Sequence, residues 1–185
     1  MTAHAQATWP RPGEPFTKAH LELLPDDGRR SELLDGVLIV SPTPTWLHQR
    51  ALLNLMMLLH RDCPPELEVL PGPLNIDISE DSVLRPDLLV VRRDRLGEVH
   101  LAGMPDLVVE VLSPETHRFD LDLKRGRYED AGCPNYWVVD PDAPSIVMWD
   151  MVDGRYREAG RAEGDTELCP TSPYHVVANP ARLVD

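Results

Sequence analysis

The clearest pattern in the chain is a helical repeat of apolar residues over residues 45–61, which a Cys-Pro-Pro run at 63–65 ends. The residues of this apolar stripe are Leu52, Leu55, Met56 and Leu59. We expect Thr43 to cap the helix and Pro44 to lie in its first turn. His48 then lies at the N-terminal end of the stripe, where the helix dipole disfavours a charged imidazolium.

Short apolar runs between turn residues predict strands in much of the remaining chain. Two Asp-Gly pairs, at 35–36 and 153–154, join apolar runs and predict β-hairpins. Further strands are expected at 66–70, 74–78, 84–91, 106–112 and 135–139, and further helices at 18–24 and 119–130. Pro86 implies an edge, a bulge or a strand start within 84–91. The segment 106–139 therefore forms a strand, a crossover helix and a second buried strand, which favours an α/β fold.

Length and composition indicate one globular domain. The 185 residues are 42% hydrophobic and 26% charged, and we expect a flexible N-terminal arm at 1–15 followed by a single domain at 16–185. No apolar run reaches the roughly 20 residues of a membrane span, and the N-terminus lacks a secretory pattern, so a cytoplasmic protein is expected. Three cysteines without a C-x-x-C pair argue against a disulfide framework and a structural zinc site.

The charge of the chain limits its nucleic-acid partners. Acidic residues number 31 against 18 basic ones, which gives a formal net charge of −13. Such a charge repels nucleic acid at long range, so a DNA partner must be held locally.

Two carboxylates interrupt apolar strand patterns, at Asp87 and Glu110. A buried, unpaired carboxylate costs several kcal/mol, so each needs a partner. Mg²⁺ is one candidate, because it binds one or two carboxylates together with waters and phosphates. The alternative is that Asp87 pairs with Arg85 or caps a turn, while Glu110 forms a salt bridge with Arg92 or Arg93.

Three further residues are candidates for the same site. Lys124 follows Glu110 by 14 positions on the crossover helix and could reach back to it, or it could pair with Asp120 on a solvated helix face. His48 could accept or relay a proton, or it could be a half-buried residue at a helix end. Glu32 could join the acids or be a surface strand residue.

Several stretches together carry a family resemblance. They are 31–36, 41–44 leading to His48-Gln49, 85–91, 105–114, 120–128 and 132–141. Over roughly residues 16–156 the chain resembles the Uma-two family of restriction-endonuclease-like proteins, a bacterial branch of the PD-(D/E)xK nuclease superfamily.

The resemblance implies a restriction-endonuclease-like fold and a set of site residues. The fold is a mixed β-sheet flanked by helices, with peripheral β-hairpins and the site at one end of the central strands. Asp87 and Glu110 correspond to the metal-binding acids, Lys124 to the lysine and Glu32 to an additional acid. His48 corresponds to a recurring histidine without an assigned role.

The implied chemistry is Mg²⁺-dependent hydrolysis of phosphodiester bonds in DNA, with Mn²⁺ as a substitute metal. Asp87, Glu110 and the Val111 carbonyl would hold the metal. The superfamily pattern has a lysine two positions after the second acid, where this chain has Leu112. Lys124 is therefore assigned from its placement on the following helix.

Two alternatives to a DNA endonuclease remain open. The net charge favours a catalytically degenerate nuclease fold used for binding or dimerisation, because no broad basic face is evident. The second alternative is a hydrolase of small phosphoesters. Apolar residues of the closing hairpin, Val147, Trp149 and Tyr156, suggest a homodimer surface, or else they cover one end of the sheet.

Overall fold

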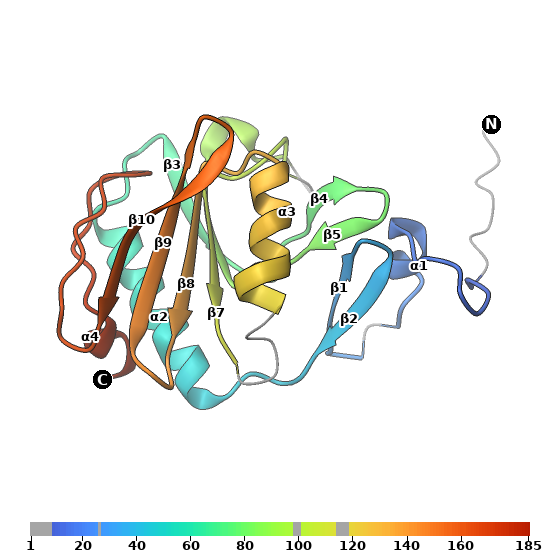
Figure 1. Ribbon diagram of the computed structural model, residues 1–185, viewed down its shortest axis with the longest axis horizontal. Coiled ribbons are helices and arrows are strands. Elements are labelled where there is room, and N and C mark those ends of the chain that lie inside the picture. Colours follow the sequence, from blue (N-terminus) through green and yellow to red (C-terminus); the bar gives the residue numbers. More distant parts are fainter. Residues whose placement is uncertain (1–8, 26, 98–100, 114–118) are drawn as a thin grey trace.

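The computed structural model describes residues 9–25, 27–97, 101–113 and 119–185, with only the backbone described at 119–121. Most of the strands form one mixed sheet (Figure 1). These strands are β3 (Leu67–Pro71), β6 (Leu88–Arg92), β7 (Leu107–Val111), β8 (Asn135–Asp140), β9 (Ser145–Val152) and β10 (Arg155–Glu163). Their order is β10-β9-β8-β7-β6-β3, and the β7–β8 pair is parallel while the other pairs are antiparallel.

A second, smaller sheet is formed by strands from the N-terminal half of the chain. Its antiparallel strands are β1 (Arg30–Leu34), β2 (Val37–Ser41), β4 (Ile76–Ser79) and β5 (Ser82–Leu84), in the order β2-β1-β5-β4. The helix α1 (Lys18–Glu22) packs against β1 through the buried Leu21. The expected mixed sheet with helices and peripheral hairpins is thus confirmed.

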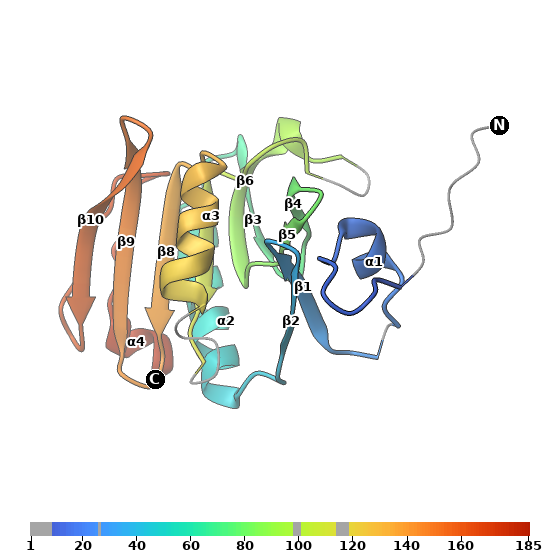
Figure 2. The same cartoon turned by 45° about the vertical axis from the view of Figure 1, so that its right-hand side comes forward.

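Helices cover both faces of the large sheet. On one face, α2 (Trp46–Arg61) and α4 (Pro180–Val184) pack against the alternating residues of the central strands. On the other face lies α3 (Arg125–Asp130) (Figure 2). Its Tyr128 is buried in one core cluster with residues of β7, β8 and β9. No helix in the described ranges is long and apolar enough to cross a membrane.

The predicted strand–helix–strand unit is confirmed, with a change in the helix. β7 is buried at all five positions and runs parallel to β8, as two-faced burial predicts. The helix begins with a π-helical segment, Phe119–Lys124, before it becomes α-helical at Arg125. The predicted turn at 113–115 falls largely outside the described residues.

Two predicted boundaries are wrong. The cap of α2 is Thr45, whose hydroxyl accepts the His48 N–H at 3.2 Å, and not Thr43. The single strand expected at 84–91 is two strands, because the chain leaves the small sheet after Leu84 and enters the large sheet at Leu88. The segment with Pro86, which has no backbone donor, lies at this crossing between sheets.

Both Asp-Gly hairpins are confirmed. Asp35 and Gly36 have positive φ angles of 52° and 75°, and Asp153 and Gly154 have 51° and 76°. Two successive positive φ angles are typical of the two-residue turn that suits the twist of antiparallel strands.

The proposed dimer surface on the closing hairpin is wrong. Trp149 and Val147 are only 7% and 8% exposed, and both pack in the core beneath α3. Tyr156 is half-buried and stacks on Tyr136, with ring centroids 6.1 Å apart. These residues therefore cover the sheet, which was the alternative interpretation.

The boundary between an N-terminal arm and the domain stays a prediction. Residues 1–8 lie outside the described ranges. Trp9 is 56% exposed, and its ring lies edge-on to Phe16 with centroids 5.8 Å apart.

Candidate functional site

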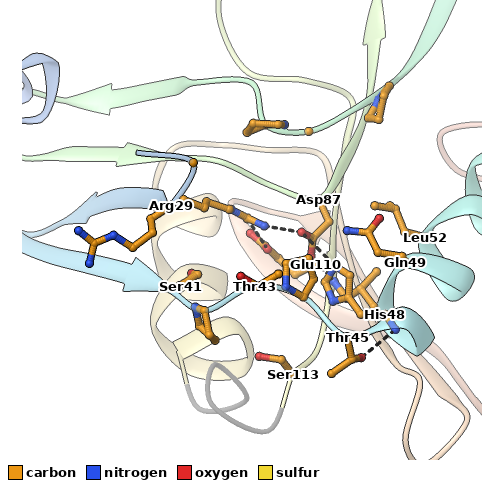
Figure 3. Close-up of a pocket in the computed structure, with 18 of the residues that line it drawn as sticks. Arg29, Ser41, Thr43, Thr45, His48, Gln49, Leu52, Asp87, Glu110 and Ser113 are labelled. Atoms are coloured by element: carbon orange, nitrogen blue, oxygen red, sulfur yellow. Dashed lines mark hydrogen bonds and ion pairs between the residues drawn. The ribbon is translucent and has the colours of Figure 1, made fainter. Parts of the chain in front are cut away.

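A pocket of about 600 Å³ lies where the two sheets meet the N-terminal end of α2. Its walls come from the segment before β1, the link between β2 and α2, the first turn of α2 and the end of β3 (Figure 3). Asp87, Glu110, His48 and Lys124 all line it. The pocket thus brings together four of the five residues proposed from the sequence, and Glu32 contacts Lys124 from the adjacent strand β1.

The three acidic candidates are buried. Glu32 on β1 is 0% exposed, Glu110 on β7 is 1% exposed, and Asp87, just before β6, is 5% exposed. Glu32 is therefore not a surface strand residue. Charges at this depth require partners, because the solvation they lose on burial must be replaced.

Asp87 is held from three sides. Its Oδ2 accepts the Val111 N–H at 2.7 Å, its Oδ1 accepts a hydrogen bond from Arg30 Nη1, and His48 Nε2 lies 3.6 Å from the same Oδ1. Burial by itself raises the pKa of the Asp87 carboxyl, but His48, Arg30 and the Val111 N–H outweigh burial and lower that pKa to about 2. Asp87 is therefore ionised at neutral pH.

Lys124 joins the other two acids. Its Nζ donates to Glu32 Oε2 at 2.9 Å and to Glu110 Oε1 at 3.2 Å, and the residue is 3% exposed. Glu32 Oε1 also accepts the Arg85 N–H at 2.7 Å. The solvated helix face considered for Lys124 is therefore excluded. The π-helical segment ends at this residue, and such segments are frequent at functional sites.

The lysine that contacts Glu110 comes from the following helix and not from position 112. Leu112, two residues after Glu110, is buried in the core. The following helix instead brings an ammonium group to Glu110 from 14 residues away in the sequence.

His48 is buried rather than half-exposed. It is the third residue of α2 and 6% exposed, and it faces Asp87 across the pocket floor. Its Nδ1 is buried with no hydrogen-bond partner in the described part of the chain. The imidazole therefore stands beside Asp87 with one ring nitrogen available.

The sequence interpretation missed Arg30, the first residue of β1. Its guanidinium contacts Asp87, reaches Glu110 Oε2 at 3.4 Å and has its Nε 3.7 Å from Glu32 Oε2. Burial lowers the pKa of Arg30, but the three carboxylates more than offset this and raise the pKa above its ordinary value. Strand alternation could have found this residue, because Arg30 lies two positions before Glu32 and shares its face of the strand.

The ion pairs considered as alternatives for Asp87 and Glu110 are not those of the structure. Arg85 donates through Nε to Asn75 at 2.7 Å, and its carbonyl accepts from Arg30. The other two arginines have local partners: Arg92 pairs with Asp94, and Arg93 pairs with Glu68.

The sequence model of the Uma2 family, described as "Putative restriction endonuclease", matches residues 19–176. The chain belongs to the Uma2 family. The match spans every residue that the geometry brings to the pocket floor, from Arg30 to Lys124. None of the curated proteins matches the chain.

A solved structure has the same fold as this Uma2 chain. It is a protein described as a "putative nuclease belonging to DUF820" from Anabaena variabilis ATCC 29413, with 20% sequence identity and a TM-score of 0.72. The similarity covers 92% of this chain and 98% of that one. The likeness supports the assignment of the fold.

The donor set of this Uma2 site suits a hard divalent cation. Asp87 Oδ1 and Glu110 Oε2 are directed at one positive group, the Arg30 guanidinium. Two converging carboxylates match the way proteins bind Mg²⁺. The described residues contain no cluster of three or more His, Cys, Asp or Glu side chains with the geometry of a metal site. Val111 lines the pocket, and its carbonyl as a further ligand stays a prediction.

Gly72 fixes the segment that carries Asp87. Its N–H donates to the Asp87 carbonyl at 2.7 Å, and a Cβ at this position would lie 2.1 Å from the Pro86 carbonyl oxygen. We expect Gly72→Ala to lower the free energy of unfolding by about 1–3 kcal/mol, because backbone must shift to admit the methyl group. Urea denaturation measures this loss.

Gly126 provides the matched control within α3. A Cβ there meets no atom of the described residues within 4 Å. Gly126→Ala should raise the unfolding free energy by up to about 1 kcal/mol through helix propensity. A Gly72→Ala protein as stable as the wild type would contradict the close approach at Pro86.

Proposed function

We propose that this protein is a metal-dependent endonuclease that hydrolyses phosphodiester bonds in DNA. The observation that carries the proposal is the convergence of Asp87 Oδ1 and Glu110 Oε2 on one cationic group at the floor of the pocket. Membership of the Uma2 family supports the reaction class.

In this proposal Asp87, Glu110 and the Val111 carbonyl hold Mg²⁺ or Mn²⁺. A bound divalent cation supplies Lewis acidity to a phosphate oxygen and to water. Asp87 is suited to this task because its lowered pKa keeps the carboxylate charged. The Val111 N–H, bound to Asp87 Oδ2, restricts the rotation of that carboxylate and leaves Oδ1 directed at the pocket.

Lys124 supplies a compact positive charge beside the proposed metal ligand Glu110. An ammonium group there offsets the negative charge that develops on a phosphate during attack, and it can orient the attacking water. Glu32 is a positioning residue, because it holds Lys124 through one oxygen and the Arg85 N–H through the other. His48 is a second positioning residue, because it lies on α2 with its Nε2 3.6 Å from Asp87 Oδ1.

The DNA would be held near the pocket rather than by the whole surface. The net charge of −13 opposes long-range attraction of a polyanion. The first turn of the 16-residue helix α2 faces the pocket through His48 and Gln49, and the positive end of the helix dipole there favours a phosphate. A homodimer and a cytoplasmic location stay predictions.

Plasmid nicking tests the proposal. The wild-type protein should convert supercoiled plasmid to the open circle with Mg²⁺ or Mn²⁺ and should stop when EDTA is added. Glu110→Gln should lose this activity. Glu68→Gln on β3, where the carboxylate pairs with Arg93, should retain it. Absence of nicking by the wild type, or equal nicking by Glu110→Gln, would refute the assignment.

A binding module without catalysis is the second candidate. Two observations favour it: the acidic net charge, and the guanidinium of Arg30 in contact with both proposed metal ligands. A module of this kind would show no rise in melting temperature with Mn²⁺, because ligands stabilise only the proteins that bind them. Hydrolysis of bis(p-nitrophenyl) phosphate without plasmid nicking would instead indicate a small-phosphoester hydrolase.

A further inference from the structure

Arg30 holds a permanent positive charge between the two acids that the proposed metal requires. Nη1 of the guanidinium donates to Asp87 Oδ1, and Nη2 lies 3.4 Å from Glu110 Oε2 while it also donates to the Arg85 carbonyl. One planar group therefore bridges carboxylates from two separate strand segments.

The oxygens that face Arg30 are also the ones that a metal in the pocket would contact. The second oxygen of Asp87 accepts the Val111 N–H, and the second oxygen of Glu110 accepts from Lys124. A divalent cation would need direct contact with the same Asp87 Oδ1 and Glu110 Oε2. The guanidinium and the metal thus compete for the same pair of atoms.

The net charge of the cluster favours replacement of the guanidinium by a divalent cation. Arg30 and Lys124 stand against Glu32, Asp87 and Glu110, so these five side chains carry a formal charge of −1. Withdrawal of the guanidinium leaves the other four side chains with a formal charge of −2 and removes this cation from Asp87 Oδ1 and Glu110 Oε2.

The guanidinium can leave the two acids by moving into the pocket. The Arg30 side chain is 24% exposed and lines the pocket, and its Nε is buried without a hydrogen-bond partner in the described part of the chain. A phosphate in the pocket would offer two acceptor oxygens in the fork geometry that guanidinium groups bind best.

We propose that Arg30 is a phosphate-binding residue which, in the absence of substrate, closes the metal site by bridging Asp87 and Glu110. Phosphate draws the guanidinium away from the acids and so makes room for the metal. Metal and phosphate therefore bind with positive cooperativity, each raising the affinity for the other. This inference rests on the proposed function, because it concerns the same metal and the phosphate of the same substrate.

Mn²⁺ affinity, measured by electron paramagnetic resonance of the free ion, tests the competition without any assay of activity. Arg30→Gln should bind Mn²⁺ at least tenfold more tightly than the wild type. Arg30→Lys keeps the charge but lacks the planar guanidinium fork, whose Nη1 and Nη2 reach Asp87 Oδ1 and Glu110 Oε2 separately, so it too should bind more tightly. Arg61→Gln is the matched control, because it removes the same charge from an exposed arginine paired with Asp62 at the C-terminal end of α2 and should change the affinity less than threefold.

Sulfate tests the phosphate half of the proposal. It is a tetrahedral oxyanion that does not precipitate Mn²⁺, and sodium chloride at equal ionic strength is the control. Sulfate should tighten Mn²⁺ binding at least threefold in the wild type and in Arg61→Gln, and should have no such effect in Arg30→Gln.

The outcomes separate this inference from the proposed function. Equal Mn²⁺ affinities of wild type and Arg30→Gln, with plasmid nicking intact, would overturn the role of Arg30 alone. Absence of Mn²⁺ binding by every variant, together with absence of nicking, would overturn both. If Arg30→Gln does not fold without metal, the comparison of Arg30→Lys with the wild type decides the question.

Discussion

Replacing Asp87 with asparagine should lower the rate of plasmid nicking by about 10²–10³-fold or more. The amide lacks the negative charge that holds a divalent cation, and a metal contributes several kcal/mol to the stabilisation of a phosphoryl transition state. The fold should survive, because the amide oxygen can still accept the Val111 N–H that Asp87 Oδ2 accepts. Nicking rates at saturating Mg²⁺ and far-ultraviolet circular dichroism measure the two effects.

Asp62→Asn is the control for this substitution. Asp62 is an exposed carboxylate at the C-terminal end of α2, paired with Arg61 at 2.7 Å and remote from the pocket. This variant should nick plasmid at the wild-type rate. If Asp87→Asn also did so, the assignment of Asp87 as a metal ligand would be wrong.

Replacing Lys124 with methionine should cause the largest loss of stability among single substitutions at the site. Methionine leaves the carboxylates of Glu32 and Glu110 buried without the ammonium that contacts both. Breaking a buried ion pair by removing one partner costs about 3–5 kcal/mol. For a chain of this length that corresponds to a fall in melting temperature of about 6–20 °C.

The second lysine of the chain provides the comparison. Lys18 pairs with Asp77 near the surface, where its side chain is 30% exposed, and Lys18→Met should cost less than about 1 kcal/mol. Adding Glu32→Gln to Lys124→Met should recover part of the loss, because it removes one uncompensated charge. Equal melting temperatures for the two lysine variants would show that the buried pairs do not stabilise the fold.

The sequence alone identified two acids of the site, because a charged side chain is out of place in an apolar strand. Asp87 and Glu110 stand in runs of apolar residues, where an unpaired charge is costly, and both proved to be buried and paired. Lys124 offered no such signal, since its pattern suits a solvated helix equally well. Its distance from Glu110 in the sequence made it a candidate, the family resemblance implied the same residue, and the structure placed it against Glu110.

Arg30 shows what the sequence interpretation lacked. An arginine at the start of a strand is ordinary at the surface. Of the three acids that contact Arg30, Glu32 is the one nearby in the sequence. Its partner Glu110 lies 80 residues away in the sequence. Contacts at that separation depend on how the two sheets pack, which no local pattern encodes.

What the sequence determined by itself is therefore the identity of most elements, because helix period, strand alternation and Asp-Gly turns follow from local backbone geometry. Even the wrong cap of α2 erred by only two residues, from Thr43 to Thr45. Only the tertiary structure decided that the chain changes sheets at Pro86 and that β1 meets β7 across the pocket. Those features depend on long-range packing, where burial of apolar faces selects one pairing of segments that the local patterns leave open.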